Sequence, residues 1–177
     1  MANEIPVYLF VGFLESGKTK FIQETFEDPN FDSGDKTLLL VCEEGEEEYN
    51  EKKFAFPGVT LKVLEDKAEL NPQNLARLEK ESGAGRVVIE YNGMWRMEKL
   101  YRDVLPANWV LYQIMTFVQA PTFELFVKNM GQLMMEKITN ADMLVFNRCT
   151  DELKAALRKR NLRMVNRRAD IYLEDLN

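Results

Sequence analysis

The chain has 177 residues, of which 46% are hydrophobic and 29% charged, the balance of a globular protein with a core of ordinary size. Its net charge of −6 argues against a general nucleic-acid binder, and its lack of histidine excludes Ser-His-Asp and Cys-His catalysis. No apolar run reaches the ~20 residues of a membrane span, and the start lacks a signal-peptide pattern, so we expect a cytoplasmic protein outside the membrane.

Apolar runs alternate with helical spacings along the chain. Strands are predicted at 6–11, 36–42, 59–64, 86–91, 109–118 and 142–146. Helices are predicted at 18–26, 72–79, 94–104, 121–139 and 151–159, and the segment 162–173 is left open as the place of a last short strand. Because most strands are apolar throughout, we expect an α/β fold of three layers, with a mainly parallel sheet covered by helices on both faces.

A phosphate-binding motif lies between the first predicted strand and helix. Residues 12–19, GFLESGKT, match G-x-x-x-x-G-K-[ST] at every fixed position. Gly12 and Gly17 permit a tight backbone whose N–H groups point toward phosphate oxygens. Lys18 reaches the β and γ phosphates, and Thr19 offers its hydroxyl to Mg²⁺. The sequence therefore predicts a P-loop NTPase fold that binds a nucleoside triphosphate with magnesium.

The motif and its surroundings have a family resemblance. The segment 6–21, PVYLFVGFLESGKTKF, resembles the CobW-type GTPases of the CobW/HypB/UreG family. Further segments match in the family's order, namely 40–46 (LVCEEGE), 88–93 (VIEYNG), 141–151 (ADMLVFNRCTD) and 161–171 (NLRMVNRRADI). The resemblance implies one nucleotide-binding domain over 1–177 that binds GTP or GDP with Mg²⁺. It also implies a slow GTPase switch, related to metal-cofactor chaperones, that acts on a protein partner or forms a homodimer.

The resemblance assigns the phosphates to the loop and the start of its helix. The residues implied are Gly12, Glu15, Ser16, Gly17, Lys18, Thr19 and Lys20. Among them Lys18 would neutralise charge on the β and γ phosphates and so serve catalysis. Lys20 stands where the family usually has a threonine, and its backbone N–H would lie near the α phosphate.

The resemblance also places acidic and switch residues outside the loop. Glu90 ends an apolar strand and would approach Mg²⁺ together with Thr19, which makes it the second catalytic candidate. Gly93 would sense the γ phosphate through its N–H. Glu43 or Glu44 would belong to the first switch. A different interpretation of Glu90 is a carboxylate that caps the following helix.

The segment that would recognise the base departs from the family pattern. The family motif N-K-x-D aligns with Asn147, Arg148, Cys149 and Thr150, and Asp151 follows one position late. Asn147 can bond the base edge and the Arg148 stem can stack on the ring, but threonine cannot supply a charged acceptor for guanine. Either the loop is one residue longer and Asp151 fills that role, or base specificity is relaxed. GTP is favoured on the resemblance.

Metal chemistry has few candidate ligands. Cys42 and Cys149 stand alone, so neither a disulfide scaffold nor a structural zinc site is expected. The cysteine cluster with which many CobW-type proteins bind metal has no counterpart here, and Cys42 is expected to pack at a strand end. The segment 42–51 carries six glutamates, which suit either a hard cation or a mobile switch.

Two other functions remain open. An ATP-dependent small-molecule kinase would need a basic lid, for which the segment 154–168, with seven Lys or Arg, is the candidate. A regulatory scaffold without turnover would explain the altered residues Lys20 and Thr150. The family normally has a second domain after this one, so the chain is either part of a longer protein or a stand-alone domain.

Overall fold

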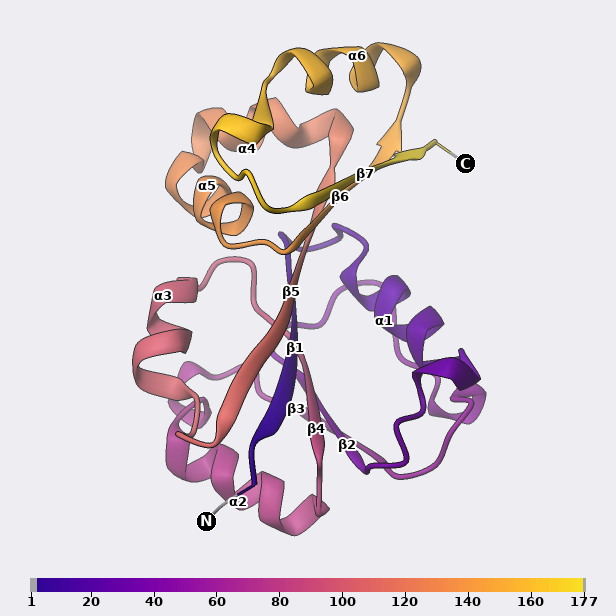
Figure 1. Ribbon diagram of the computed structural model, residues 1–177, viewed down its shortest axis with the longest axis vertical. Coiled ribbons are helices and arrows are strands. Elements are labelled where there is room, and N and C mark those ends of the chain that lie inside the picture. Colours follow the sequence, from indigo (N-terminus) through magenta and orange to yellow (C-terminus); the bar gives the residue numbers. More distant parts are fainter. Residues whose placement is uncertain (1–2, 177) are drawn as a thin grey trace.

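The sheet organises the whole chain. A computed structural model describes residues 3–176 and contains, within that range, one seven-stranded sheet in the order β3-β2-β4-β1-β5-β6-β7 (Figure 1). All neighbouring strands are parallel. The strands are β1 (Ile5–Val11), β2 (Thr37–Val41), β3 (Val59–Val63), β4 (Arg86–Glu90), β5 (Trp109–Gln119), β6 (Met143–Cys149) and β7 (Asp170–Asp175). The predicted α/β fold is confirmed, and β7 is the last short strand.

Helices cover both faces of this sheet. They are α1 (Lys18–Phe26), α2 (Pro72–Ser82), α3 (Met97–Lys99), α4 (Phe123–Asn129), α5 (Gly131–Thr139) and α6 (Asp151–Lys159). Single 3₁₀ turns lie at Pro29–Phe31, Glu51–Lys53, Lys67–Glu69, Ala120–Thr122 and Leu162–Met164. Figure 1 shows α1 on one side of the sheet and α2, α3 and α5 on the other. Among the described residues, no helix is both long and apolar enough to cross a membrane.

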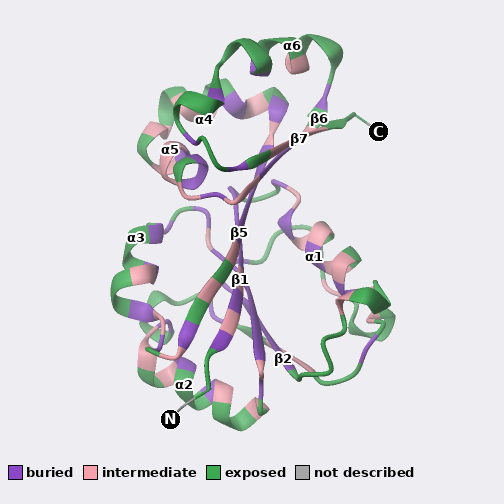
Figure 2. Cartoon of the chain, viewed as in Figure 1, coloured by how far each residue is buried: buried purple, intermediate pink, exposed green. Residues whose placement is uncertain are grey.

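Strand β2 shows why the apolar runs form a sheet buried on both faces. All five of its residues are buried, and Figure 2 shows the central strands buried together. Leu38 and Leu40 belong to the cluster that includes Leu75 of α2, whereas Leu39 belongs to the cluster that includes Phe26 of α1. Since successive side chains of a strand point to opposite faces, a strand between two helical layers is apolar at nearly every position, as Leu38 to Val41 are.

Two predicted helices differ from the structure. The single helix at 121–139 is wrong: α4 and α5 are separated at Met130, whose backbone is not helical (φ −137°, ψ 44°), just before Gly131. Glycine favours a break because it loses more backbone freedom in a helix than other residues do. The helix at 94–104 begins only at Met97 and continues as a π-helical turn over Leu100–Val104. The Asn92 side chain accepts from the Met94 N–H at 2.9 Å and holds the preceding residues in a turn.

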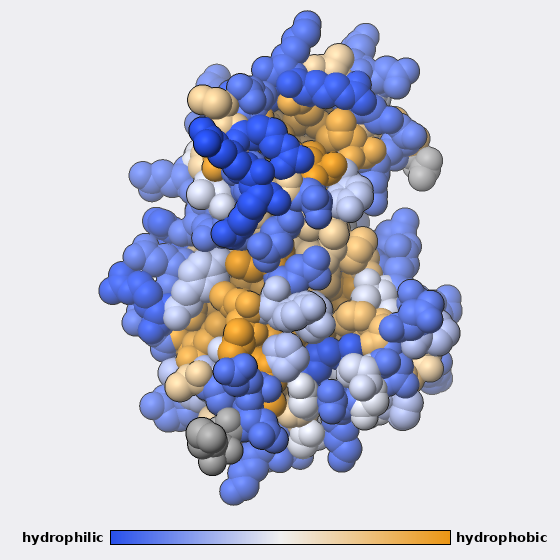
Figure 3. Space-filling view, viewed as in Figure 1, coloured by the Kyte–Doolittle hydropathy of each residue, from blue (hydrophilic) through white to orange (hydrophobic). Residues whose placement is uncertain are grey.

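Strand β5 is continuously buried only in its second half, although Trp109 at its start is also buried. Val110 is 43% exposed and Tyr112 is 69% exposed, whereas the residues from Ile114 to Val118 are buried. β5 pairs with β6 only from Met115 onward, so its first half has β1 as its neighbour on one side. Figure 3 shows hydrophobic side chains at the surface in the region between α3 and β5. A half-covered strand of this kind alternates between buried and exposed residues.

The carboxyl ends of the strands lie at one edge of the sheet. In parallel α/β sheets this edge holds the ligand site. The residues that follow β1, β2, β4 and β6 include the phosphate loop, Glu43, Gly93 and Thr150. The fold therefore brings most of the predicted site residues to the same edge.

Candidate functional site

The loop between β1 and α1 requires glycine at two positions. Gly12 has φ +153°, and a Cβ there would lie 2.6 Å from the Phe117 carbonyl oxygen. Gly17 has φ +101°, and a Cβ there would lie 2.9 Å from the Asn147 amide nitrogen. Gly17 also occupies the N-cap of α1, where among the described residues no side chain caps the first turn. The N–H groups at this positive helix end can therefore bind an anion.

Lys18 is buried under this loop, with 3% of its surface exposed. Its ammonium donates to the Gly12 carbonyl at 2.5 Å and forms an ion pair with Glu43. The same Glu43 oxygen lies 3.3 Å from the Gly93 N–H. Two groups assigned by the resemblance to the γ phosphate thus converge on one carboxylate. The structure places Glu43 at this position, while Glu44 is exposed.

Thr19 and Glu90 form a second cluster beside the first. The Thr19 hydroxyl donates to one oxygen of Glu90 at 2.5 Å, and the Tyr49 hydroxyl donates to the other at 2.6 Å. Burial raises the pKa of the Glu90 carboxyl, although both hydrogen bonds oppose that rise. Arg96, not Glu90, occupies the N-cap of α3, so the interpretation of Glu90 as a helix cap is wrong. A hydroxyl and a carboxylate side by side are oxygen ligands of the kind that Mg²⁺ takes.

Tyr49 is a site residue that the sequence interpretation missed. It lies in the acidic segment 42–51 and contacts Glu90, 41 positions further along the chain. Burial raises the pKa of its hydroxyl above the ordinary value, and the neighbouring Glu90 acts in the same direction. The sequence signal for Tyr49 was that it is the one aromatic residue among the glutamates of this segment. Such a ring is more often packed against the protein than solvated, which indicates a contact inside the fold.

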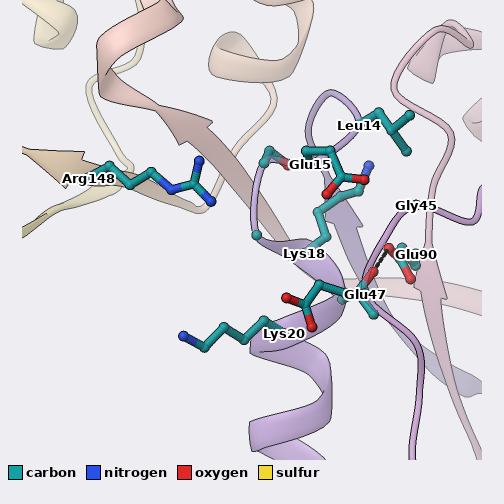
Figure 4. Close-up of a pocket in the computed structure, with 11 residues that line it drawn as sticks. Leu14, Glu15, Lys18, Lys20, Gly45, Glu47, Glu90 and Arg148 are labelled. Atoms are coloured by element: carbon teal, nitrogen blue, oxygen red, sulfur yellow. Dashed lines mark hydrogen bonds between the residues drawn. The ribbon is translucent and has the colours of Figure 1, made fainter. Parts of the chain in front are cut away.

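The phosphate loop is hydrogen-bonded to the acidic segment. Glu15 has a left-handed backbone (φ +64°), and its carboxylate accepts from the Glu46 N–H at 2.9 Å. A Cβ on Gly45 would lie 2.1 Å from that carboxylate, so the contact needs glycine there. The resulting pocket is lined by Leu14, Glu15, Ser16, Gly17, Lys18, Thr19, Lys20, Gly45, Glu47, Glu90 and Arg148. In Figure 4, Arg148 extends from β6 toward the loop, and the Lys20 ammonium points away from Lys18.

The segment that the resemblance assigns to the base, Asn147 to Asp151, is only partly at the pocket. The Asn147 amide donates to the Ser16 carbonyl at 2.7 Å and so joins β6 to the phosphate loop. Arg148 lines the pocket with a left-handed backbone (φ +54°). Thr150 is the N-cap of α6 and accepts from the Leu153 N–H at 3.2 Å. Asp151 is the first residue of α6 and is exposed, and in the described structure it is not part of the pocket lining.

Cys42 packs at the end of β2, as predicted. It is fully buried, and burial together with the charges of Glu90 and Glu43 raises the pKa of its thiol to about 12. A thiol in this state is a poor metal ligand, since the thiolate is the form that binds. Across residues 3–176, no group of three or more Cys, Asp or Glu side chains is arranged to hold a metal ion.

Basic residues of the segment 154–168 form ion pairs with carboxylates of the same chain. Its ion pairs are Lys154 with Asp175, Arg160 with Glu124 and Arg168 with Asp142. These partners lie in β7, in α4 and just before β6. Within the described residues, the pocket lining contains no member of this segment.

Solved structures share this architecture at low sequence identity. Zn(II)-bound YjiA GTPase from E. coli is 22% identical, with a TM-score of 0.63 over 97% of this chain and 57% of YjiA. HypB from Helicobacter pylori in complex with nickel is 13% identical, with a TM-score of 0.60 over 97% of this chain and 79% of HypB. FlhF complexed with GMPPNP and Mg²⁺ is 12% identical, with a TM-score of 0.55 over 99% of this chain and 67% of FlhF.

The chain has the fold of a P-loop GTPase. This confirms, at the level of the fold, the resemblance to the CobW/HypB/UreG-type proteins that the motifs predicted. Neither protein-family models nor curated proteins give a match to the sequence. The chain spans little more than half the length of YjiA, the first of these neighbours.

Proposed function

We propose that this chain is a magnesium-dependent GTP-binding protein and a slow GTP hydrolase that acts as a switch. The observation that carries the proposal is the pair of clusters at the carboxyl edge of the sheet. Lys18 and the Gly93 N–H meet at one anionic oxygen, and Thr19 and Glu90 meet beside them. A triphosphate with a divalent cation supplies the matching charges, namely anionic oxygens for the first cluster and a cation for the second.

The chain's own groups suit nucleotide recognition. Gly12 to Thr19 would hold the phosphates through N–H groups, and the buried Ser16 hydroxyl, which lacks a partner among the described residues, would face them. Asn147 and Arg148 would contact the base. The bound nucleotide and Mg²⁺ would supply the chemistry of phosphoryl transfer to water, which depends on positioning and charge neutralisation.

The role in metal handling rests on the neighbours. YjiA was solved with zinc and HypB with nickel, and this chain has their fold. Since Cys42 is a buried thiol, we propose that the switch controls a protein partner, or pairs as a homodimer, rather than carrying metal on thiolates. We further propose that residues 1–177 act as one nucleotide-binding domain, because strands from Ile5 to Asp175 share one sheet. We propose the cytoplasm as its location.

The alternative of an ATP-dependent small-molecule kinase has weaker support. A kinase lid must close over the phosphates with free basic side chains. Lys154, Arg160 and Arg168 pair instead with carboxylates of this chain. The scaffold alternative differs from the proposal only in turnover, because it uses the same pocket.

Calorimetric titration tests the proposal. The full chain is titrated with GTP, GDP and ATP, each with and without Mg²⁺, and phosphate release is then measured with and without zinc or nickel. We expect GTP to bind only weakly without Mg²⁺ and to be hydrolysed slowly. Tighter binding of ATP than GTP contradicts guanine recognition, and binding without any phosphate release favours the scaffold.

A further inference from the structure

Lys137 of α5 is an unusual buried lysine. Only 1% of its surface is exposed, although lysine is among the residues least often buried. It lies on the inward face of the helix with Met134 and Ile138. Among the residues that the structure describes, no carboxylate forms an ion pair with it. Burying a charge without a counterion is costly, so the ammonium must be held by other groups.

Two parts of the candidate site hold that ammonium. It donates to the Gly93 carbonyl at 2.6 Å and lies 4.4 Å from the centre of the Phe13 ring. Phe13 is the second residue of the phosphate loop, and Gly93 follows β4. A cation over an aromatic face is attracted to it, more strongly when desolvated. Lys137 thus connects the phosphate loop to the segment that carries the Gly93 N–H.

The Gly93 backbone is in close contact with the phosphate loop. A Cβ at this position would lie 2.5 Å from the Gly12 carbonyl oxygen and 2.7 Å from the Phe13 Cα. On its other side the Gly93 N–H lies 3.3 Å from the Glu43 oxygen that also accepts from Lys18. Any shift of the Gly93 backbone therefore changes where its N–H points relative to the Lys18 ammonium.

We propose that Lys137 is a positioning residue for triphosphate recognition. Its ammonium holds Gly93 against the phosphate loop, so that the Gly93 N–H and the Lys18 ammonium can both bind the same anionic group. This inference rests on the proposed GTP-binding function. It adds that the Lys137 contact determines how strongly the site prefers a triphosphate to a diphosphate. The γ phosphate is the part of the nucleotide that a diphosphate lacks, so a loosened Gly93 weakens triphosphate binding selectively.

The charge of Lys137 is sensitive to pH in the accessible range. Burial, together with the charge of Lys18, lowers the pKa of Lys137 to about 8. Arg96 acts in the same direction, whereas Glu136 and Glu43 act against it. Below pH 8 the ammonium is charged and holds the Gly93 carbonyl. As the pH rises through 8 the charge is lost and the contact weakens, so triphosphate preference should fall in that window.

The test compares the dissociation constants of GDP and of a non-hydrolysable GTP analogue, both with Mg²⁺. The full chain, Lys137→Met and the control Lys128→Met, at an exposed lysine of α4, are titrated at pH 7 and pH 9. For Lys137→Met at pH 7 we expect about 10-fold weaker binding of the triphosphate analogue and less than about twofold change for GDP. The control should match the unmodified chain.

The pH dependence of the unmodified chain tests the inference without any variant having to fold. In the unmodified chain the preference for triphosphate should fall several-fold between pH 7 and pH 9, and in Lys137→Met it should be flat. Equal loss of both nucleotides in the variant, or a pH-independent preference in the unmodified chain, overturns the inference and leaves a packing role. If the unmodified chain binds neither nucleotide, the proposed function fails instead.

Discussion

The side of the pocket proposed to bind phosphates, around Lys18 and Thr19 (the phosphate side), and the side proposed to bind the base, around Asn147, Arg148 and Thr150 (the base side), are built differently. On the phosphate side, Lys18 and Thr19 are held by buried partners that come from β4 and the acidic segment. On the base side, Asn147 is tied to the phosphate loop, while Arg148 reaches the pocket from a left-handed backbone and Thr150 caps a helix. The phosphate side is therefore preorganised, and the base side offers few fixed polar groups. The difference suggests that affinity comes from the phosphates and that discrimination between bases is modest.

Replacing the loop lysine should have the largest effect. Lys18→Ala removes a charge-assisted contact to the phosphates, and we expect GTP affinity to fall roughly 100-fold or more. It also leaves Glu43 buried without its partner, which typically costs about 3–5 kcal/mol of stability. Titration calorimetry and thermal unfolding measure the two effects.

Two further variants separate binding from folding. Lys18→Ala combined with Glu43→Ala should recover most of the lost stability, because the buried charge is gone, but its GTP affinity should stay well below that of the unmodified chain, because the lysine contact to the phosphate is still missing. Lys20→Ala should change neither by much, because Lys20 is exposed and the phosphate contact implied for it is made by its backbone N–H, which alanine keeps. Affinity that returns fully to the level of the unmodified chain in the double variant would show that Lys18 acts only by balancing Glu43.

The Glu43 carboxylate should weaken the binding of a triphosphate. This carboxylate occupies Lys18 and faces the Gly93 N–H, so an incoming anionic phosphate must displace it. Glu43→Gln keeps the shape and removes the charge, and we expect triphosphate affinity to rise about 10-fold. Without nucleotide the variant should melt earlier, since Lys18 loses its counterion. The nucleotide-induced rise in melting temperature should be larger than for Glu44→Gln, the exposed control.

The sequence could predict which residues of the phosphate side lie together, because most of them are close in the chain. The glycines, Lys18 and Thr19 lie within eight consecutive positions of the motif, and Glu90 ends an apolar strand whose partner strands follow from parallel packing. Tyr49 and Lys137 could not be placed in the same way. Their contacts join positions 41 and 44 apart, and nothing in their immediate neighbours indicates the partner.

Sequence periodicity predicted which segments are helices and strands better than it predicted where each one begins and ends. The spacing that gave one helix at 121–139 passes through Phe126, Met130 and Met134, each four positions apart, so the apolar pattern continues across the break. The Met130 N–H still bonds the Phe126 carbonyl and the Met130 carbonyl still accepts from Met134. The chain changes direction there while the apolar face stays continuous, and a face pattern alone does not reveal such a turn.

A substitution at Thr150 can increase the preference for guanine without destabilising the start of α6. Aspartate caps helices as well as threonine does, so Thr150→Asp should keep the start of α6 while adding the acceptor that guanine recognition uses. We expect the ratio of GTP to ATP affinity to rise about fivefold, measured by parallel titrations. Asp151→Asn should leave that ratio unchanged, because Asp151 is exposed at the helix start. A large loss of GTP preference in Asp151→Asn would instead assign the acceptor to Asp151.

The two non-glycine residues of the pocket lining that have a left-handed backbone give the finest comparison of the two sides. Glu15 and Arg148 both have positive φ, a backbone that costs roughly 1 kcal/mol in a residue other than glycine. Arg148→Gly should relieve that cost and raise the melting temperature by about 2–4 °C. It should also weaken GTP about threefold through the lost stacking.

Glu15→Gly relieves the same strain but loses the hydrogen bond to the Glu46 N–H, so its stability should change by less than about 0.5 kcal/mol. The freed acidic segment 42–51 should then be cut faster by a glutamate-specific protease, because proteolysis follows local opening. If Glu15→Gly stabilises the chain as much as Arg148→Gly and protease sensitivity is unchanged, the Glu15 contact does not hold that segment. The phosphate side would then be preorganised by Lys18 and Glu90 alone.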